Sequence, residues 1–163
     1  LFRCLEPDRA YFGQKDFQQF RVIQWMTRRV FSNSIRLRLV PTVREASGLA
    51  LSSRNRYLDT VQRRTARLLH ETLTWGGREA LGGASIQTTQ RRMRRRLALG
   101  GFELVEYASL VDPFTLRTPV SGRRAGSSAP LLAAAAVRLQ GVRLIDNVLW
   151  GRCDTIEKVG CRC

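Results

Sequence analysis

Hydrophobic and polar residues follow a strand–helix–strand pattern near the start of the chain. Residues 9–13 (RAYFG) predict a short strand closed by glycine, and residues 35–41 (IRLRLVP) alternate between aliphatic residues and arginine. Between them, residues 16–29 place apolar side chains at helical spacing. Strand, helix and strand in this order predict a βαβ unit of an α/β domain. Two strands and one helix cannot bury their own faces, so we expect further strands of this sheet to lie outside the chain.

A second region begins after a polar loop at residues 42–57 and opens with two helices. The first helix is expected to begin at Asp59 or Thr60 and to end near Trp75, where the Gly76-Gly77 pair interrupts the pattern. The second helix is expected between Ser85, as its N-cap, and Leu99, before two further glycines.

Three strands are predicted after these helices, at residues 102–110, 131–139 and 142–149. Residues 43–149 therefore predict a small α+β domain, with two helices against a short and mainly antiparallel sheet. The Ser- and Gly-rich stretch 121–130 (SGRRAGSSAP) is expected to be a mobile loop.

The charge is strongly positive, with 28 Lys and Arg against 13 Asp and Glu and a formal net charge of +15. Only Lys15 and Lys158 are lysine, and the remaining basic residues are arginine. This ratio indicates an arginine-rich coding bias spread over the surface, which promotes non-specific contact with polyanions at low salt. No apolar run is long enough to span a bilayer, and no signal peptide pattern is present.

The cysteines lie at positions 4, 153, 161 and 163, and the one histidine is His70. The spacing of Cys153, Cys161 and Cys163 lacks the paired C-x-x-C arrangement of structural zinc sites. It favours free thiols in a cytoplasmic protein over a disulfide framework or a metal site. His70 is expected to serve packing or the surface, since one histidine in this position builds no catalytic triad.

The first candidate site is the turn formed by Gly13, Gln14, Lys15 and Asp16, between the first strand and the first helix. In open α/β sheets ligands bind at the carboxyl ends of strands, and a helix N-terminus favours anions. Glycine allows close approach of a ligand, and lysine supplies a point charge for phosphate. The alternative is structural, because Asp16 and Gln19 have the spacing of a capping box.

The second candidate site is residues 51–54 (LSSR), in the loop that contains Gly48. Two hydroxyls and a guanidinium are good donors to a polyphosphate, and arginine can bind it through two hydrogen bonds. The alternative is an ordinary polar loop before a helix. No Walker A or G-x-G-x-x-G pattern occurs in the chain, which excludes the common phosphate loops.

Five arginines gather in residues 91–96, around Met93. We expect them to form the solvent-exposed side of the second helix of the α+β domain. The alternative is a basic module that binds RNA or DNA. Replacing these arginines with serine would abolish polyanion binding by such a module and leave a nucleotide site elsewhere intact.

Three segments together resemble one enzyme family. They are PDRAYFGQKDFQQF, VPTVREASGLALSSRNRYL and RLIDN, in that order and spacing. They are similar to the pantothenate synthetase (pantoate–β-alanine ligase) family, and the resemblance extends from Leu1 to about Leu149.

The resemblance implies the fold and the reaction. Residues 1–42 would be the end of a Rossmann-like, nucleotidyltransferase-type domain, residues 43–149 a closing domain, and residues 150–163 an atypical tail. The implied reaction uses ATP and Mg2+ to convert pantoate to pantoyl adenylate and pyrophosphate, and β-alanine then displaces AMP to give pantothenate. The resemblance also implies a cytoplasmic homodimer in the full-length form, with no membrane or specific nucleic acid as partner.

The resemblance assigns roles to the two candidate sites. It implies that Gly13 and Asp16 contact the ATP ribose, that Lys15 contacts the phosphates beside Gln14, and that Gln19 holds pantoate. The backbone of Val43 would meet adenine. The counterpart of the mobile phosphate-gripping loop is Leu51, Ser52, Ser53 and Arg54. Lys15, Ser52 and Arg54 are then the expected catalytic contacts, and no residue is assigned to a metal.

The chain departs from the family pattern in three places. Gln14 replaces the usual glutamate, and the tail after Leu149 matches no family segment. The family's M-G-x-L-H-x-G-H segment, whose histidines contact ATP phosphates, is absent from these 163 residues. We therefore expect the chain to be a portion of something longer and to make no pantothenate by itself. A non-functional remnant is the alternative.

Overall fold

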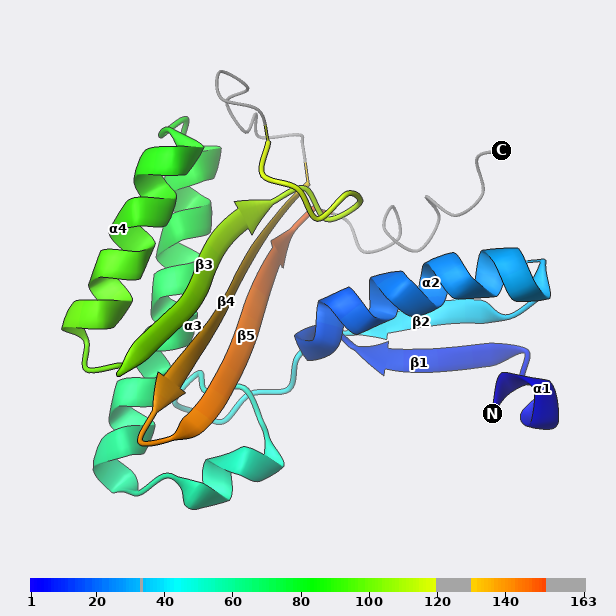
Figure 1. Ribbon diagram of the computed structural model, residues 1–163, viewed down its shortest axis with the longest axis horizontal. Helices are drawn as coiled ribbons and strands as arrows, with labels where there is room; N and C mark the ends of the chain where they lie inside the picture. Colours follow the sequence, from blue (N-terminus) through cyan, green and yellow to red (C-terminus); the bar gives the residue numbers. More distant parts are fainter. Residues whose placement is uncertain (33, 120–129, 152–163) are drawn as a thin grey trace. The chain divides into compact units, whose positions relative to one another are not determined.

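The computed structural model describes residues 1–32, 34–119 and 130–151, and within them the chain forms two units (Figure 1). The first unit is Leu1–Thr42 and the second is Val43–Gly151. Nearly all of the expected mobile loop and the three cysteines of the tail lie outside the described residues.

The first unit is a βαβ arrangement, as the sequence pattern predicts. After a single helical turn, α1 (Phe2–Leu5), strand β1 (Arg9–Gly13) leads through the 3₁₀ turn η1 (Gln14–Asp16) into helix α2 (Phe17–Phe31). Strand β2 (Arg36–Val40) then lies parallel to β1, from the Arg9–Arg36 pair to the Gly13–Val40 pair. The helix is thus the crossover between two parallel strands, which confirms the α/β class.

Aromatic side chains hold α2 against the small sheet. Phe20 is fully buried, with its ring centroid 6.2 Å from Phe12 of β1 and 6.3 Å from Phe17. In β2, Leu39 is buried while the flanking residues are exposed or half-buried, so the predicted alternation has the predicted sides. Much of the outer surface stays apolar, because Tyr11, Val22 and Trp25 remain 63, 59 and 56% exposed.

The second unit packs two helices on one face of a three-stranded antiparallel sheet (Figure 1). The strand order is β3-β4-β5, with β4 in the centre. This is the predicted α+β arrangement, and the predicted strand positions are confirmed to within two residues. The bounds are η2 (Ser53–Tyr57), α3 (Thr60–Leu81), α4 (Ile86–Leu99), β3 (Leu104–Val111), β4 (Leu131–Leu139) and β5 (Val142–Trp150).

Small residues of β4 allow the two helices to lie close to the sheet. Ala133 and Ala135 are fully buried and belong to one core cluster with Leu73 of α3 and with Met93 and Leu97 of α4. The core thus combines small side chains of the central strand with larger ones of the helices.

Helix α3 passes through the Gly76-Gly77 pair, so the predicted end near Trp75 is wrong. Both glycines are buried in the helix, and a Cβ at either position would overlap a neighbour. At Gly76 the neighbour is the side chain of Met93, and at Gly77 it is the ring of Trp150. The glycines therefore make room for packing and do not interrupt the helix.

The capping box lies at α3 and is absent from α2. Asp16 is the N-cap of α2, but its side chain makes no cap hydrogen bond, so the expected capping box of Asp16 and Gln19 is wrong. At α3 the same spacing is used: Asp59 Oδ1 accepts from Gln62 N at 2.8 Å, and Gln62 Oε1 accepts from Asp59 N at 3.0 Å. At α2 the chain enters the helix directly from the 3₁₀ turn η1, without a side-chain cap.

Candidate functional site

The first candidate site is the turn that follows β1. Gly13 has φ −67° and ψ 135°, which any residue can adopt, and a Cβ added there would meet no atom within 4 Å among the described residues other than its two chain neighbours. Neither backbone conformation nor packing within the chain therefore requires glycine at this position. The absence of a side chain leaves the carboxyl end of β1 open to an approaching molecule.

Three polar residues follow Gly13 in this turn. Asp16 is exposed, and its carboxylate is not used to cap α2. Gln14 and Lys15 are half-buried, and both interact with other parts of the chain. The turn thus presents a glycine, a carboxylate and a lysine within four residues, which is the combination expected from the sequence.

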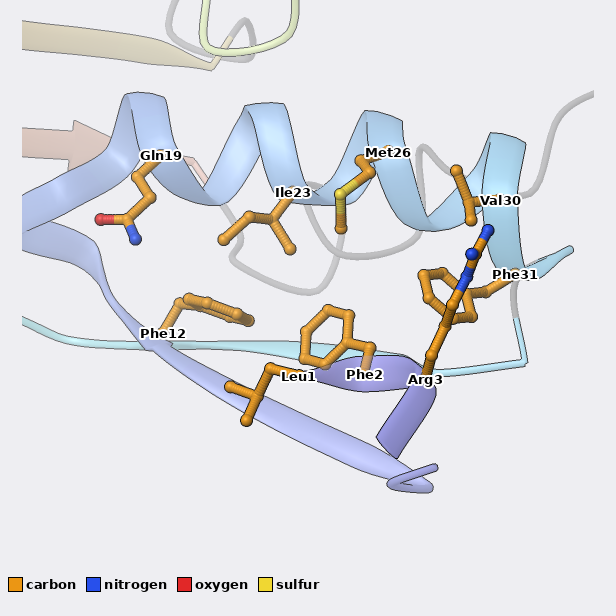
Figure 2. Close-up of a pocket in the computed structure, with 9 residues that line it drawn as sticks. All are labelled: Leu1, Phe2, Arg3, Phe12, Gln19, Ile23, Met26, Val30 and Phe31. Atoms are coloured by element: carbon orange, nitrogen blue, oxygen red, sulfur yellow. The ribbon is translucent and has the colours of Figure 1, made fainter. Parts of the chain in front are cut away.

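An apolar groove of about 500 Å³ lies along α2 in the same unit (Figure 2). Gln19 lies at one end of the groove and Arg3 at the other, with apolar side chains between them. The full lining is Leu1, Phe2, Arg3, Phe12, Gln19, Ile23, Met26, Val30 and Phe31. Such a groove suits a small ligand with an aliphatic body and a polar group at its end.

The second candidate site is the loop at the start of the second unit. Its two sides are joined by a bridge between Arg44 and Ala50 and by a hydrogen bond of 2.9 Å from Leu51 N to Val43 O. The structure therefore brings Val43 beside Leu51, two residues that the sequence analysis selected separately. Both side chains are exposed, at 63 and 52%.

The hydroxyl and guanidinium of this loop lie at its surface. Ser52 is the N-cap of η2, and its Oγ accepts a hydrogen bond of 3.2 Å from Arg54 N. Its hydroxyl proton is still available for donation, since a hydroxyl both donates and accepts. Ser53 and Arg54 are exposed. The loop thus offers several donors to an anion within one short turn.

A network of buried polar groups lies beneath this loop, and the sequence analysis did not select it. Arg44 binds Asp146 of β5 through both ends of its guanidinium, with Nη1–Oδ2 at 2.7 Å and Nη2–Oδ1 at 3.0 Å. Asp146 is 4% exposed. A signal was present, because the predicted strand 142–149 places Asp146 on the same face as Leu144, and a carboxylate on an apolar face requires a cationic partner.

His70 lies beside this ion pair without a hydrogen bond to it. Its Nδ1 is 3.7 Å from Asp146 Oδ2 and has no hydrogen-bond partner among the described residues. Burial, followed by the nearby Arg44 guanidinium, lowers the pKa of His70 below its ordinary value of 6.5, although Asp146 and Glu71 act in the opposite direction. His70 is therefore a packing residue at the edge of the polar network, as expected.

The arginines of α4 lie on its exposed side, as predicted, while Met93 is fully buried. In the described ranges no helix has both the length and the hydropathy to cross a membrane. The same ranges bring no three His, Cys, Asp or Glu side chains together as a metal site. Cys4 is an exposed free thiol.

The parallel βαβ unit, followed by a unit with two helices on an antiparallel sheet, defines an α/β protein with two different sheets. The chain belongs to the pantoate-beta-alanine ligase family, whose model matches residues 1–149. The family resemblance inferred from the sequence is thus confirmed.

Individual relatives match over nearly the whole chain. Pantothenate synthetase of Moorella thermoacetica is 41% identical over 152 residues, which cover 91% of this chain and 51% of the relative. The enzyme of the same name from Chloroflexus aurantiacus is 43% identical over 150 residues, which cover 91% of this chain and 52% of the relative.

A solved structure shares the fold. The crystal structure of pantothenate synthetase from Thermus thermophilus superimposes with a TM-score of 0.78 at 36% identity and covers 90% of this chain and 51% of that one. The chain thus spans about half the length of the relatives that it matches.

Proposed function

We propose that this chain is part of a pantoate–β-alanine ligase that condenses pantoate with β-alanine at the expense of ATP, through pantoyl adenylate. The observation that carries the proposal is the open turn at Gly13, where neither backbone conformation nor packing calls for glycine. Membership of the pantoate-beta-alanine ligase family supports the assignment of this opening to ATP.

In this proposal the turn after β1 binds the ribose and phosphates of ATP. The Asp16 carboxylate accepts hydrogen bonds from ribose hydroxyls, and the absence of a side chain at Gly13 admits the sugar. Lys15 neutralises phosphate charge, with Gln14 beside it as an uncharged neighbour. Position and charge at the end of a parallel strand support these roles.

The loop of the second unit supplies further contacts to ATP in this proposal. Backbone groups of Val43 face adenine, and residues 51–54 donate to the phosphates. Ser52 donates its hydroxyl proton, and the Arg54 guanidinium forms two hydrogen bonds to phosphate oxygens. The exposure of these groups supports this role, because a loop that closes on a ligand must present its donors to solvent beforehand.

The groove along α2 accepts pantoate. The aliphatic lining suits the branched carbon skeleton of this acid, and the Gln19 amide donates a hydrogen bond to its polar end. Binding of both substrates places the pantoate carboxylate against the α-phosphorus of ATP.

The chemistry then needs no nucleophile from the protein. A pantoate carboxylate oxygen attacks the α-phosphorus, the bond to the bridging oxygen breaks, and pyrophosphate leaves with its electron pair. The amine of β-alanine next attacks the acyl carbon, loses a proton and expels AMP. The chain contributes positioning and cationic stabilisation of the charge that develops on phosphate, through Lys15, Ser52 and Arg54.

Three further features of the proposal rest on family resemblance alone: Mg2+, a homodimer and a cytoplasmic location. Magnesium usually reaches such sites on the nucleotide phosphates, with one or two carboxylates from the protein. The described residues bring no three His, Cys, Asp or Glu side chains together.

Paired arginine variants test the nucleotide site. Arg54→Ala is expected to weaken ATP binding by the 163-residue chain about tenfold or more, because a charged hydrogen bond to phosphate is lost. Arg56→Ala is the matched control, since Arg56 lies on the same turn, is exposed and stacks on Tyr57 instead. Calorimetric titration with ATP measures both. Equal weakening in the two variants would indicate general charge attraction and would overturn the assignment.

A further inference from the structure

The loop proposed to bind ATP has a hairpin-like base, whereas residues 51–54 lie beyond it. The base consists of one bridge, between Arg44 and Ala50, and of backbone hydrogen bonds from Leu51 N to Val43 O, from Glu45 N to Leu49 O and from Gly48 N to Glu45 O. Its proposed ligand groups lie at the surface, so they contribute little packing that could fix the loop. Side chains beneath the loop connect this base to the rest of the second unit.

The first anchor is the guanidinium of Arg44. Besides its two bonds to Asp146, it donates to Gly48 O at 3.1 Å and to Asn147 O at 3.3 Å. One side chain thereby connects β5 with both ends of the turn from 44 to 48. A planar guanidinium with four such contacts has a single orientation, and it transmits that orientation to the loop.

Asp146 depends on Arg44 for its charge balance. Asp146 Oδ1 also accepts from Asn147 N at 2.8 Å, but Arg44 is the cation in direct contact with the carboxylate. His70 Nδ1, at 3.7 Å, lies beyond hydrogen-bond distance. A carboxylate that is 4% exposed is costly unless it is paired, so the pair holds together firmly.

The second anchor holds the other end of the loop. The buried Asn55 donates through Nδ2 to Glu45 Oε1 at 3.0 Å and to Ala50 O at 3.1 Å. Arg63 of α3 donates to the same Glu45 oxygen at 3.1 Å and to Asn55 O at 2.7 Å. Residues 51–54 thus extend between two fixed points.

We propose that Asp146 is a positioning residue, which acts through Arg44 to hold Val43 and residues 51–54 in the geometry that binds ATP. This inference rests on the proposed function. Asp146 touches no substrate in the proposed function. It influences ATP binding only through the conformation of the loop.

A pair of variants separates positioning from stability. Asp146→Asn leaves the Arg44 charge with a neutral partner and is expected to lower the melting temperature and to weaken ATP binding about tenfold. The double variant Arg44→Met with Asp146→Leu replaces the ion pair by apolar contact. Such replacements often restore stability. The melting temperature should therefore recover, whereas ATP binding should stay weak, because the anchor is still absent.

Hydrogen exchange of backbone amides provides a measurement that is independent of ATP. In both variants, amides of residues 44–54 are expected to exchange about tenfold faster without nucleotide, while those of β4 keep their protection in the double variant. Glu106→Gln is the matched control. It breaks ion pairs with Arg143 of β5, at 2.9 Å, and with Arg138 of β4, at 3.3 Å, and should leave exchange in the loop unchanged.

The outcomes are distinguishable. Unchanged loop exchange in Asp146→Asn overturns the inference, whatever happens to ATP. Recovery of ATP binding together with stability in the double variant also overturns it, because the role would then be structural only. If the unmodified chain binds no ATP, the proposed function fails, and loop exchange still decides whether Asp146 anchors the loop.

Discussion

His70 is the residue whose ionisation the fold changes most clearly near neutral pH. It is half-buried beside the Arg44–Asp146 pair, and burial lowers its pKa below 6.5. Between the lowered pKa of the folded chain and about 6.5, His70 is therefore protonated in the unfolded chain and neutral in the folded chain. The free energy of unfolding therefore rises with pH in this range, because the unfolded state is the better proton acceptor.

We predict that this free energy falls as the pH is lowered from about 7.5 through 6.5 and levels off below the lowered pKa of the folded state. Urea unfolding at a series of pH values measures it. His70→Gln is the control and should remove the slope, since His70 is the one histidine in the sequence. The same slope in both proteins would show that another group is responsible.

Asp146 illustrates what a single residue reveals before its partner is known. Its position on the inner face of a predicted strand signals a buried charge, and a buried charge requires a partner. The sequence does not identify that partner, because Arg44 is 102 positions away and competes with many other arginines. The sequence thus predicts that Asp146 needs a cationic partner, whereas the identity of that partner depends on the fold.

Glycines inside α3 show how packing can override local preference. Glycine in a helix costs about 1 kcal/mol relative to alanine, so Gly76→Ala would stabilise an isolated helix. In this protein a Cβ at position 76 overlaps Met93, which is fully buried. Overpacking of this kind costs about 1–3 kcal/mol. Because the overpacking cost is partly offset by the gain in helix propensity, we predict that Gly76→Ala lowers the free energy of unfolding by up to about 2 kcal/mol.

A double-mutant cycle in urea tests the cause. Met93→Ala alone should destabilise the chain by about 2–5 kcal/mol through the cavity that it leaves. When the two changes are combined, the loss should be smaller than the sum, because the new methyl group occupies part of that cavity. Strict additivity would show that the two residues do not compete for space.

The elements were predictable where one periodicity dominates. The alternation in residues 35–41 indicated strand β2 with its buried side, and the helical period indicated α2 and α4. The errors occurred where two physical causes share one sequence signal. A glycine pair marks a helix end or a packing notch, and the D-x-x-Q spacing matches both Asp16 and Asp59. In the first case the decision comes from Trp150, whose ring lies against Gly77. In the second case it comes from the 3₁₀ turn that precedes α2. Neither feature can be seen in the local sequence.

The two candidate sites were predictable as residue types in loops. The structure adds that Val43 and Leu51 are joined by a hydrogen bond and that a Cβ at Gly13 would meet no atom of the described residues within 4 Å, its two chain neighbours apart. It also adds the buried anchors beneath the second loop. Their members come from the loop itself, from α3 and from β5, so no single segment of sequence reveals them.

At the scale of the whole molecule, the first unit leaves much of its apolar surface uncovered. Its sheet has two described strands, and side chains such as Tyr11 and Trp25 are more than half exposed. Exposed apolar surface and unpaired strand edges favour association. These features agree with a chain that spans about half the length of its relatives.

Catalysis can be measured with these 163 residues alone and with a longer fusion. We expect this chain alone to release no AMP from ATP, pantoate and β-alanine, because the H-x-G-H segment of the family is absent from it. Joined behind the preceding half of the Moorella thermoacetica relative, it should release AMP only when both acids are present. Arg54→Ala in this fusion should reduce kcat about tenfold or more, while Arg56→Ala should not.

Each result of this experiment has a separate meaning. AMP release by the 163 residues alone would show that they hold every group that the reaction requires, contrary to our expectation. A fusion that folds with a cooperative thermal transition but forms no product would favour a non-functional remnant. Activity that is lost in Arg54→Ala and kept in Arg56→Ala would support a role of this loop in binding the nucleotide. The reason is that the only contact proposed for Arg54 is with the phosphates of ATP.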